Sequence, residues 1–150
     1  MKLDAGHVIK VNIFLIRASN MDNNFKQFRN RIIKPTAFKL FALRSLPAAF
    51  FAGLRIESLD ETKAVVSVKQ KWFNKNPFRS IYFAILSMAA ELSTGVLGMG
   101  NIYKSTPAIS MLVTEQRGVF HKKATGKIIF VCEEGNSHRG FCYAYSRQCS

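Results

Sequence analysis

Acidic residues are scarce in this sequence, and their scarcity sets its charge. Asp and Glu number 9 against 22 Lys and Arg, which gives the 150 residues a formal net charge of +13 at pH 7. A surplus of this size favours polyanionic partners such as phosphorylated cofactors, nucleic acid or an anionic membrane surface. The charge alone does not choose among these classes.

Cysteine is also rare, and all three cysteines lie in the last fifth of the chain: Cys132, Cys142 and Cys149. An odd number crowded at one end argues against a disulfide framework and for a reducing compartment, so we expect a cytoplasmic protein. A metal site formed with His138 is a minor alternative, because the paired Cys-x-x-Cys of structural zinc sites is missing. We predict no metal and no bound cofactor.

Long uninterrupted apolar runs are missing as well. The apolar stretch from Val8 to Ile16 contains Lys10 and Asn12, and no small-residue cleavage site follows it, which argues against a signal peptide. No window reaches the ~18 uncharged apolar residues of a membrane span without meeting Glu91 or several glycines. We therefore expect no integral membrane association.

Apolar residues are nonetheless abundant, at 48%, which is enough for one domain with a substantial core. From Asn23 to Ser45, phenylalanines and Ile32 recur at helical intervals with cations between them, and Pro35 divides the segment. This pattern predicts two short amphipathic helices. We interpret them as core-covering surface helices, with a basic helix lying on a membrane as the alternative.

The pattern then changes to a period of two. Leu54 to Ser58 and Lys63 to Trp72 are typical of two strands of an antiparallel hairpin, in which Val66, Val68 and Trp72 would face the core. Further strands are predicted over 108–115 and 127–134, with a break at Gly118.

A nearly all-apolar helix is predicted between these pairs of strands. Ser80 is the candidate N-cap, and glycines would end the helix near Gly95 or Gly98. Glu91 is the one formal charge between Ser80 and Tyr103, and burying it would be costly unless it had partners or a chemical role. One sheet curled around this helix, an α+β fold, would bury the helix on all sides.

The helix and the turn before it carry a family resemblance. The stretch Asn76-Pro77-Phe78-Arg79-Ser80-Ile81-Tyr82-Phe83-Ala84, followed by Glu91 and Gly95, is similar to hotdog-fold thioesterases of the phenylacetate-degradation type. In that group an Asn precedes a His-Gly-Gly by six residues, and an Asp or Glu follows the His by nine. Asn76, Tyr82 and Glu91 stand at these spacings, and residues 46–134 resemble an uncharacterised thioesterase branch of the superfamily.

The resemblance implies a hotdog domain over residues 46–134, an N-terminal extension with helices over 1–45, and an acyl-CoA thioester hydrolase. Glu91 would act as the base or nucleophile, and the backbone N–H of Phe83 would stabilise the oxyanion with help from the helix dipole. Asn76 would orient the water or the thioester carbonyl. Tyr82 stands in place of the family's His.

Two further functions stay open. Tyr82-Phe83-Ala84 replaces His-Gly-Gly, so the chain could be a non-catalytic hotdog domain that binds acyl-CoA or a related ligand. A nucleic-acid binder is supported only by net charge, because the aromatic residues form no recognised single-strand motif, and we expect no nucleic-acid partner.

The resemblance also implies partners. Hotdog subunits usually join their sheets, so we expect a homodimer or a dimer of dimers with the active site between subunits. The cations considered for the phosphates of coenzyme A are Arg79, Lys104, Arg117, Lys122 and Lys123.

The last segment, residues 135–150, fits this picture least. Two more alternating strands are expected after Val131, yet the segment has no sustained period of two. The hypotheses are a truncated chain or a shifted reading frame, leaving the sheet without its last strands. Met21 could likewise be the natural start, with residues 1–20 as an upstream extension.

Overall fold

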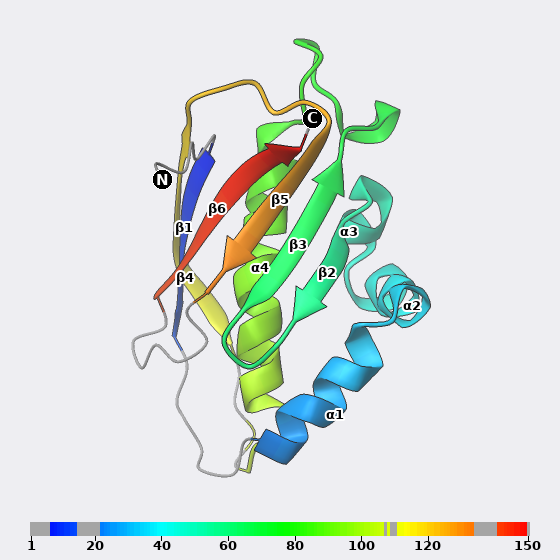
Figure 1. The fold of residues 1–150 in the computed structure, drawn as a ribbon, viewed down its shortest axis with the longest axis vertical. Helices are drawn as coiled ribbons and strands as arrows, with labels where there is room; N and C mark the ends of the chain where they lie inside the picture. Colours follow the sequence, from blue (N-terminus) through cyan, green and yellow to red (C-terminus); the bar gives the residue numbers. More distant parts are fainter. Residues whose placement is uncertain (1–6, 15–21, 107, 109–110, 134–140, 150) are drawn as a thin grey trace.

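A single antiparallel sheet organises the computed structural model, which describes residues 7–14, 22–106, 108, 111–133 and 141–149 (Figure 1). Its strand order is β2-β3-β5-β6-β1-β4. The strands are β1 (His7–Phe14), β2 (Arg55–Leu59), β3 (Ala64–Lys69), β4 (Leu112–Phe120), β5 (Lys127–Cys132) and β6 (Phe141–Cys149). The combination of this sheet with helices makes the fold α+β, as the sequence predicted.

The long helix α4 (Phe83–Ile102) lies along one face of the sheet and forms the centre of the core (Figure 1). It contacts β3, β5, β6 and β1. Leu86, Val96 and Leu97 are buried on the helix, and Val66 and Phe130 are buried on the strands. The predicted long central helix packed on an antiparallel sheet is confirmed, but the helix is not buried on all sides, because Phe83 and Glu91 are exposed.

By length and composition alone, α4 could cross a membrane. Its apolar window is 61% buried inside the fold, however, and the helix packs on the sheet. This burial is expected of the core helix of a soluble protein.

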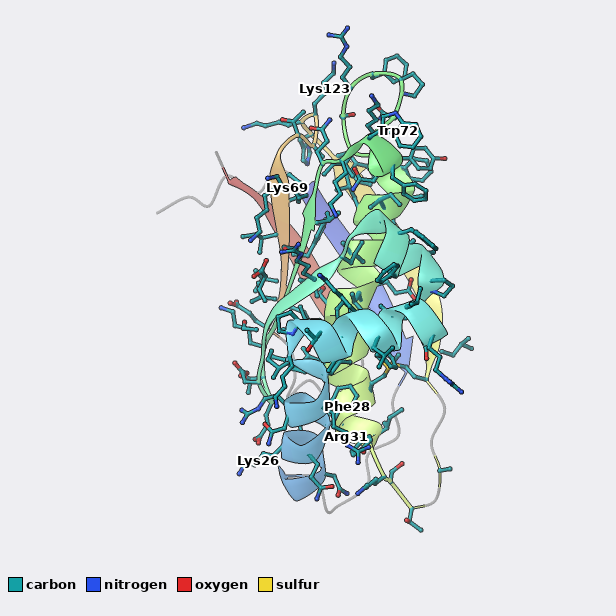
Figure 2. The ribbon with its side chains drawn as sticks, turned by 90° about the vertical axis from the view of Figure 1, so that its right-hand side faces the viewer. Lys26, Phe28, Arg31, Lys69, Trp72 and Lys123 are labelled. Atoms are coloured by element: carbon teal, nitrogen blue, oxygen red, sulfur yellow. The ribbon has the colours of Figure 1, made fainter. Side chains whose placement is uncertain are left out.

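Three shorter helices precede the sheet's first hairpin: α1 (Asp22–Ile32), α2 (Pro35–Ser45) and α3 (Pro47–Ala52). The predicted division at Pro35 is confirmed, because Pro35 is the first residue of α2. Phe25 of α1 packs so closely on Gly100 of α4 that a Cβ there would overlap its ring. Figure 2 shows α1 at one end of the molecule and Trp72 at the other.

The β2–β3 hairpin matches the prediction, but Trp72 does not. Trp72 begins a short 3-10 helix, η1 (Trp72–Asn74), and its side chain is 81% exposed. The reason lies in the buried Asn74 amide, whose Nδ2 donates to the carbonyls of Ala52 and Lys69 at 3.0 and 2.9 Å. These bonds bend the chain out of the strand and turn Trp72 toward solvent.

Helix α4 also differs from its predicted bounds. Its N-cap is Tyr82 and not Ser80, because the backbone N–H and hydroxyl of Ser80 both donate to the side chain of Asn76. The helix continues through Gly95 and Gly98, which are buried within the fold. Strand β4 starts at Leu112 instead of Ala108 and passes through Gly118 without a break.

The sheet also includes β1 and β6, which corrects in part the expectation that it lacks its last strands. Strand β6 pairs with β5 on one side and with β1 on the other. A strand with two neighbours gains ladder hydrogen bonds on both edges, so it forms without a clean apolar alternation. Of the two strands expected after Val131 one is present, and β1 occupies the next position in the sheet. The hypotheses of truncation, a shifted frame or a start at Met21 stay untested.

Candidate functional site

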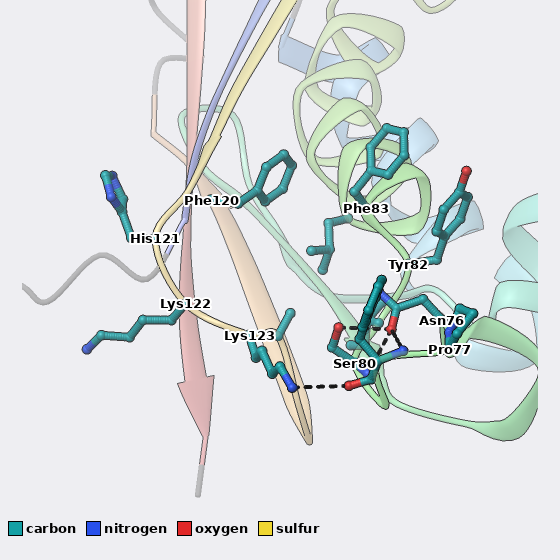
Figure 3. A pocket seen from close by; sticks show the side chains of 13 residues that line it. Asn76, Pro77, Ser80, Tyr82, Phe83, Phe120, His121, Lys122 and Lys123 are labelled. Atoms are coloured by element: carbon teal, nitrogen blue, oxygen red, sulfur yellow. Dashed lines mark hydrogen bonds between the residues drawn. The ribbon is translucent and has the colours of Figure 1, made fainter.

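The candidate site is a pocket of about 570 Å³ beside the N-terminus of α4 (Figure 3). Two segments far apart in the sequence form it, the turn that leads into α4 and the loop after β4. The lining residues are Asn76, Pro77, Phe78, Ser80, Ile81, Tyr82, Phe83, Leu86, Phe120, His121, Lys122, Lys123 and Ala124.

Asn76 organises the turn at the floor of this pocket. Its Oδ1 accepts hydrogen bonds from the Phe78 N–H at 3.0 Å and from the N–H and hydroxyl of Ser80, both at 3.1 Å. Its backbone N–H donates to the carbonyl of Ser80 at 2.8 Å. Arg79 completes the turn with a φ of 59°. Within the described part of the chain nothing accepts a hydrogen bond from Asn76 Nδ2, so this N–H group is the one the turn leaves available.

The first residues of α4 have backbone donors without helical acceptors, and Phe83 among them lines the pocket. Tyr82 is the N-cap, but its side chain makes no cap hydrogen bond, and its backbone N–H donates to the carbonyl of Asn74 at 2.9 Å. Phe83 and Ala84 are the first two helical residues, whose N–H groups have no acceptor within the helix. The positive end of the helix dipole therefore points at this end of the pocket.

Aromatic rings form much of the pocket's wall. Figure 3 shows the ring of Phe120 pointing from its strand toward α4, which carries Phe83, while the side chain of His121 points away from α4. The Tyr82 and Phe83 rings pack edge to face, with centroids 4.8 Å apart. Phe120 and His121 were not predicted as site residues. They follow Phe83 by 37 and 38 positions in the sequence, and only the folding of β4 beside α4 brings them to the pocket.

Cations border the same pocket. Lys122 and Lys123 line it, and Lys123 Nζ donates to the carbonyl of Phe78 at 3.3 Å. Arg79 lies in the Asn76 turn. Lys104 is at the opposite end of α4, where its Nζ donates to Gln27 Oε1 at 2.9 Å. Arg117 lies on β4. Of the five candidate cations, Lys122 and Lys123 line the pocket, and Arg79 lies in the adjoining turn without lining it.

Glu91 is placed differently from the expectation of a buried carboxylate. Its side chain is exposed in the single chain and does not line the pocket. Glu91 follows Phe83 by eight residues, or about 12 Å along the helix. The apolar sequence predicted a helix covered on all sides. In the structure the sheet and α1 leave one stripe of α4 exposed, which we call the open stripe.

This open stripe runs through Phe83, Ser87 and Glu91, which follow one another at four-residue intervals and therefore share a face of α4. It lies beside strand β4, because Gln116 Nε2 donates to the carbonyl of Ser87 at 2.9 Å. Strand β4 is the last strand in the sheet order, and among the described strands it pairs only with β1. The end of the described sheet and an uncovered helix stripe thus adjoin.

The part of the chain with described side chains contains no group of three or more His, Cys, Asp and Glu that could hold a metal ion. Cys132 is buried. His138 and the side chains of Cys142 and Cys149 lie outside the described part, so the alternative metal site is not tested.

Comparisons with known proteins place this geometry in a wider context. No curated protein sequence gave a significant match. Several solved structures resemble the chain. PA5026 from Pseudomonas aeruginosa, a "Protein of Unknown Function" and "Probable Thioesterase", is 17% identical, with a TM-score of 0.54 over 77% of this chain and 95% of its own.

OLEI01261 from Chlorobaculum tepidum TLS, of unknown function, is 16% identical, with a TM-score of 0.54 over 76% of this chain and 94% of its own. The genomics target APC5556 is 17% identical, with a TM-score of 0.56 over 81% of this chain and 95% of its own. At these identities the likeness shows a shared fold.

The sequence itself matches a family over residues 35–140, a range that includes α2 to β5 and with them the whole pocket and Glu91. The chain therefore belongs to the family described as "Domain of unknown function (DUF4442)".

Proposed function

We propose that this protein is an acyl-CoA thioesterase with a hotdog fold. One observation carries the proposal: Phe83, whose N–H lies at the uncapped N-terminus of α4, lines a pocket walled by aromatic rings and bordered by lysines. The fold that the chain shares with PA5026 supports it. In the reaction, water adds to the thioester carbonyl, the C–S bond breaks, and the thiol and a carboxylic acid leave.

The Phe83 N–H is the proposed oxyanion donor. Negative charge develops on the carbonyl oxygen as the nucleophile adds, and a donor already in place stabilises this charge without reorganising. The helix dipole adds to the effect because Phe83 begins a helix of 20 residues. The unpaired Nδ2 of Asn76 is the proposed second donor, while its Oδ1 holds the turn.

Glu91 completes the site from a second subunit in this proposal. Two β4 edges paired antiparallel around a two-fold axis would lay two α4 helices side by side in opposite directions. Ser87 is midway between Phe83 and Glu91, so an axis near Ser87 would bring Phe83 of one protomer toward Glu91 of its partner. The open stripe and the position of β4 at the end of the described sheet support this homodimer, and a dimer of dimers is compatible with it.

The pocket and its border suggest where the substrate's parts lie. The apolar rings would hold the acyl chain, and Lys122, Lys123 and Arg79 would meet the phosphates of coenzyme A. Lys104 is too distant to join this group and is not part of the proposal, nor is Arg117. A cytoplasmic location completes the proposal, because three cysteines crowded at one end of the sequence suit a reducing compartment.

Thiol release from short-, medium- and long-chain acyl-CoA tests the function. Wild-type turnover is expected, and Glu91→Gln is expected to lose it while keeping its fold and oligomeric state, because the amide is neither base nor nucleophile. Turnover in Glu91→Gln equal to that of the wild type would remove Glu91 from the mechanism.

A non-catalytic acyl-CoA-binding domain is the second candidate. The exposed ring of Phe83, 57% accessible, stands where the resembled enzymes carry glycine and narrows the space for a reacting thioester. Saturable binding of acyl-CoA without thiol release by the wild-type dimer would favour this candidate.

A further inference from the structure

Three large aromatic side chains are exposed together at one end of the molecule. Phe51 at 55%, Trp72 at 81% and Phe73 at 58% form what we call the aromatic patch. Phe51 of α3 and Phe73 of η1 are neighbours, with ring centroids 6.0 Å apart. Single exposed apolar residues are common on protein surfaces, but a group of this kind marks an interaction site.

The patch is held outward by the fold. The buried Asn74 fixes η1 through its bonds to the carbonyls of Ala52 and Lys69, and its Oδ1 accepts a hydrogen bond from the Lys71 N–H at 2.8 Å. Phe51 is also supported from behind by Phe50, whose ring it meets edge to face at 5.4 Å. The rings are therefore presented by a structured turn.

Cations are concentrated in the segments at the patch end. Residues 69–79 and 121–127 contain seven lysines and arginines and no Asp or Glu, and one of the seven, Lys127, pairs with Glu57 of β2. Trp72, Lys69 and Lys123 lie in the upper half of Figure 2, which is the patch end. Asp60 and Glu61 are in the β2–β3 turn, at the far end of the six-residue strand β3. The molecule thus carries an aromatic, strongly basic end.

We propose that the aromatic patch docks this protein on an anionic lipid surface. Tryptophan and phenylalanine rings insert at the level of lipid headgroups, and nearby lysines are attracted to anionic phosphates. Lys69 and Lys75 are exposed beside the patch and supply this charge complementarity.

Nucleic acid fits the same observations less well. Bases stack on open ring faces, whereas Phe51 packs edge to face on Phe50 and lies against Phe73. A headgroup layer accepts clustered rings in any orientation. The surface proposal does not depend on the proposed hydrolysis, because the pocket lining does not include the three patch aromatics, Lys69 or Lys75.

The chain's single tryptophan is Trp72, so its fluorescence reports directly on this surface. With vesicles of phosphatidylglycerol and phosphatidylcholine, Trp72 emission is expected to shift to shorter wavelength and the protein to sediment with the lipid. With vesicles of phosphatidylcholine alone at the same concentration, neither the emission shift nor the sedimentation is expected. The full chain is used throughout.

Matched variants distinguish binding through the aromatic patch from attraction by net charge. Trp72→Ser with Phe73→Ser, followed by sedimentation, is expected to abolish binding. Lys69→Gln with Lys75→Gln is expected to weaken it by about tenfold or more. Lys26→Gln with Arg31→Gln removes the same charge from α1, at the opposite end in Figure 2, and is expected to bind as the wild type does. Unchanged thermal unfolding shows that each variant is folded.

Several results would overturn the proposal. Absence of any shift with anionic vesicles would do so, as would equal weakening in the Lys26 and Arg31 control, which would mean that net charge alone acts. A blue-shifted Trp72 without vesicles, together with a smaller oligomer in Trp72→Ser, would assign the patch to a second copy of the chain. A shift caused by a double-stranded oligonucleotide that also displaces the protein from vesicles would assign it to nucleic acid.

Discussion

Phe83 serves two purposes at the residue scale, since its backbone begins α4 while its ring forms part of the pocket wall. The two can be separated by mutation. Proline is tolerated at the first helical position because the N–H it lacks has no partner inside the helix. Tyr82 already has the extended conformation, with φ −63° and ψ 135°, that a following proline requires.

We therefore expect Phe83→Pro to fold normally and to lose thioester hydrolysis by about 10²- to 10³-fold in kcat, the usual cost of one oxyanion donor. Phe83→Ala removes the ring and keeps the N–H, so it is the matched control and is expected to retain turnover. Equal activity in the two variants would exclude the Phe83 amide as the donor.

Asn76 also has two roles: its Oδ1 holds the turn, and its Nδ2 is the proposed second oxyanion donor. Asn76→Ala removes the acceptor of three hydrogen bonds and is expected to lower the free energy of unfolding by about 1–3 kcal/mol. Asn76→Asp keeps the acceptor and replaces Nδ2, so it is expected to remain stable and lose activity. Denaturant unfolding and thiol release, measured on both variants, check this. An active Asn76→Asp would limit Asn76 to the turn.

At the scale of elements, the β2–β3–β5 part of the sheet contains an ion pair that reports on pH. Lys127 Nζ lies 2.7 Å from Glu57 Oε1, and the Ser67 hydroxyl donates to the same carboxylate. The hydrogen bond from Lys127, followed by the one from Ser67, lowers the pKa of Glu57 below its usual 4.5. Both side chains of the ion pair are more than a third exposed, so the contribution is below about 1 kcal/mol.

Because folding lowers the pKa of Glu57, the ion pair stabilises the fold fully above about pH 4.5, the usual pKa. This stabilisation disappears as the pH falls through the pKa of Glu57 in the folded state. Glu57→Gln is expected to be less stable than the wild type at pH 7 and to approach it in acid. Urea unfolding from pH 7 to pH 3 measures the difference. A difference in unfolding free energy that stays constant over this pH range would contradict the role given to Glu57.

The elements also show how far local sequence signals reach. Pro35 predicted the boundary between α1 and α2, and the alternation of Val66 and Val68 predicted β3. The errors at Ser80 and Trp72 have one cause, since the side chains of Asn76 and Asn74 bond to groups that a local pattern does not bring together. Propensity alone would have made Ser80 a cap.

At the scale of the whole molecule, the sequence predicted the central helix and the residues of the turn before it, but not the pocket. Phe120, Lys122 and Lys123 join Asn76 and Phe83 only through the placement of β4 beside α4. The exposure of Glu91 could not be predicted either. Apolar residues around a helix indicate that it is covered, but they do not distinguish burial by the same chain from burial by a second subunit.

The most direct test of the proposed hydrolase, with a site shared between two protomers, is thiol release from acyl-CoA after mixing two inactive variants. Glu91→Gln and Phe83→Pro are unfolded and refolded together. Each mixed dimer then has one intact site, made by Phe83 of one protomer and Glu91 of the other. Since half of the dimers are mixed, about a quarter of wild-type turnover is expected. Mixed dimers, identified by mass, whose activity does not exceed that of the separate variants would contradict the shared site.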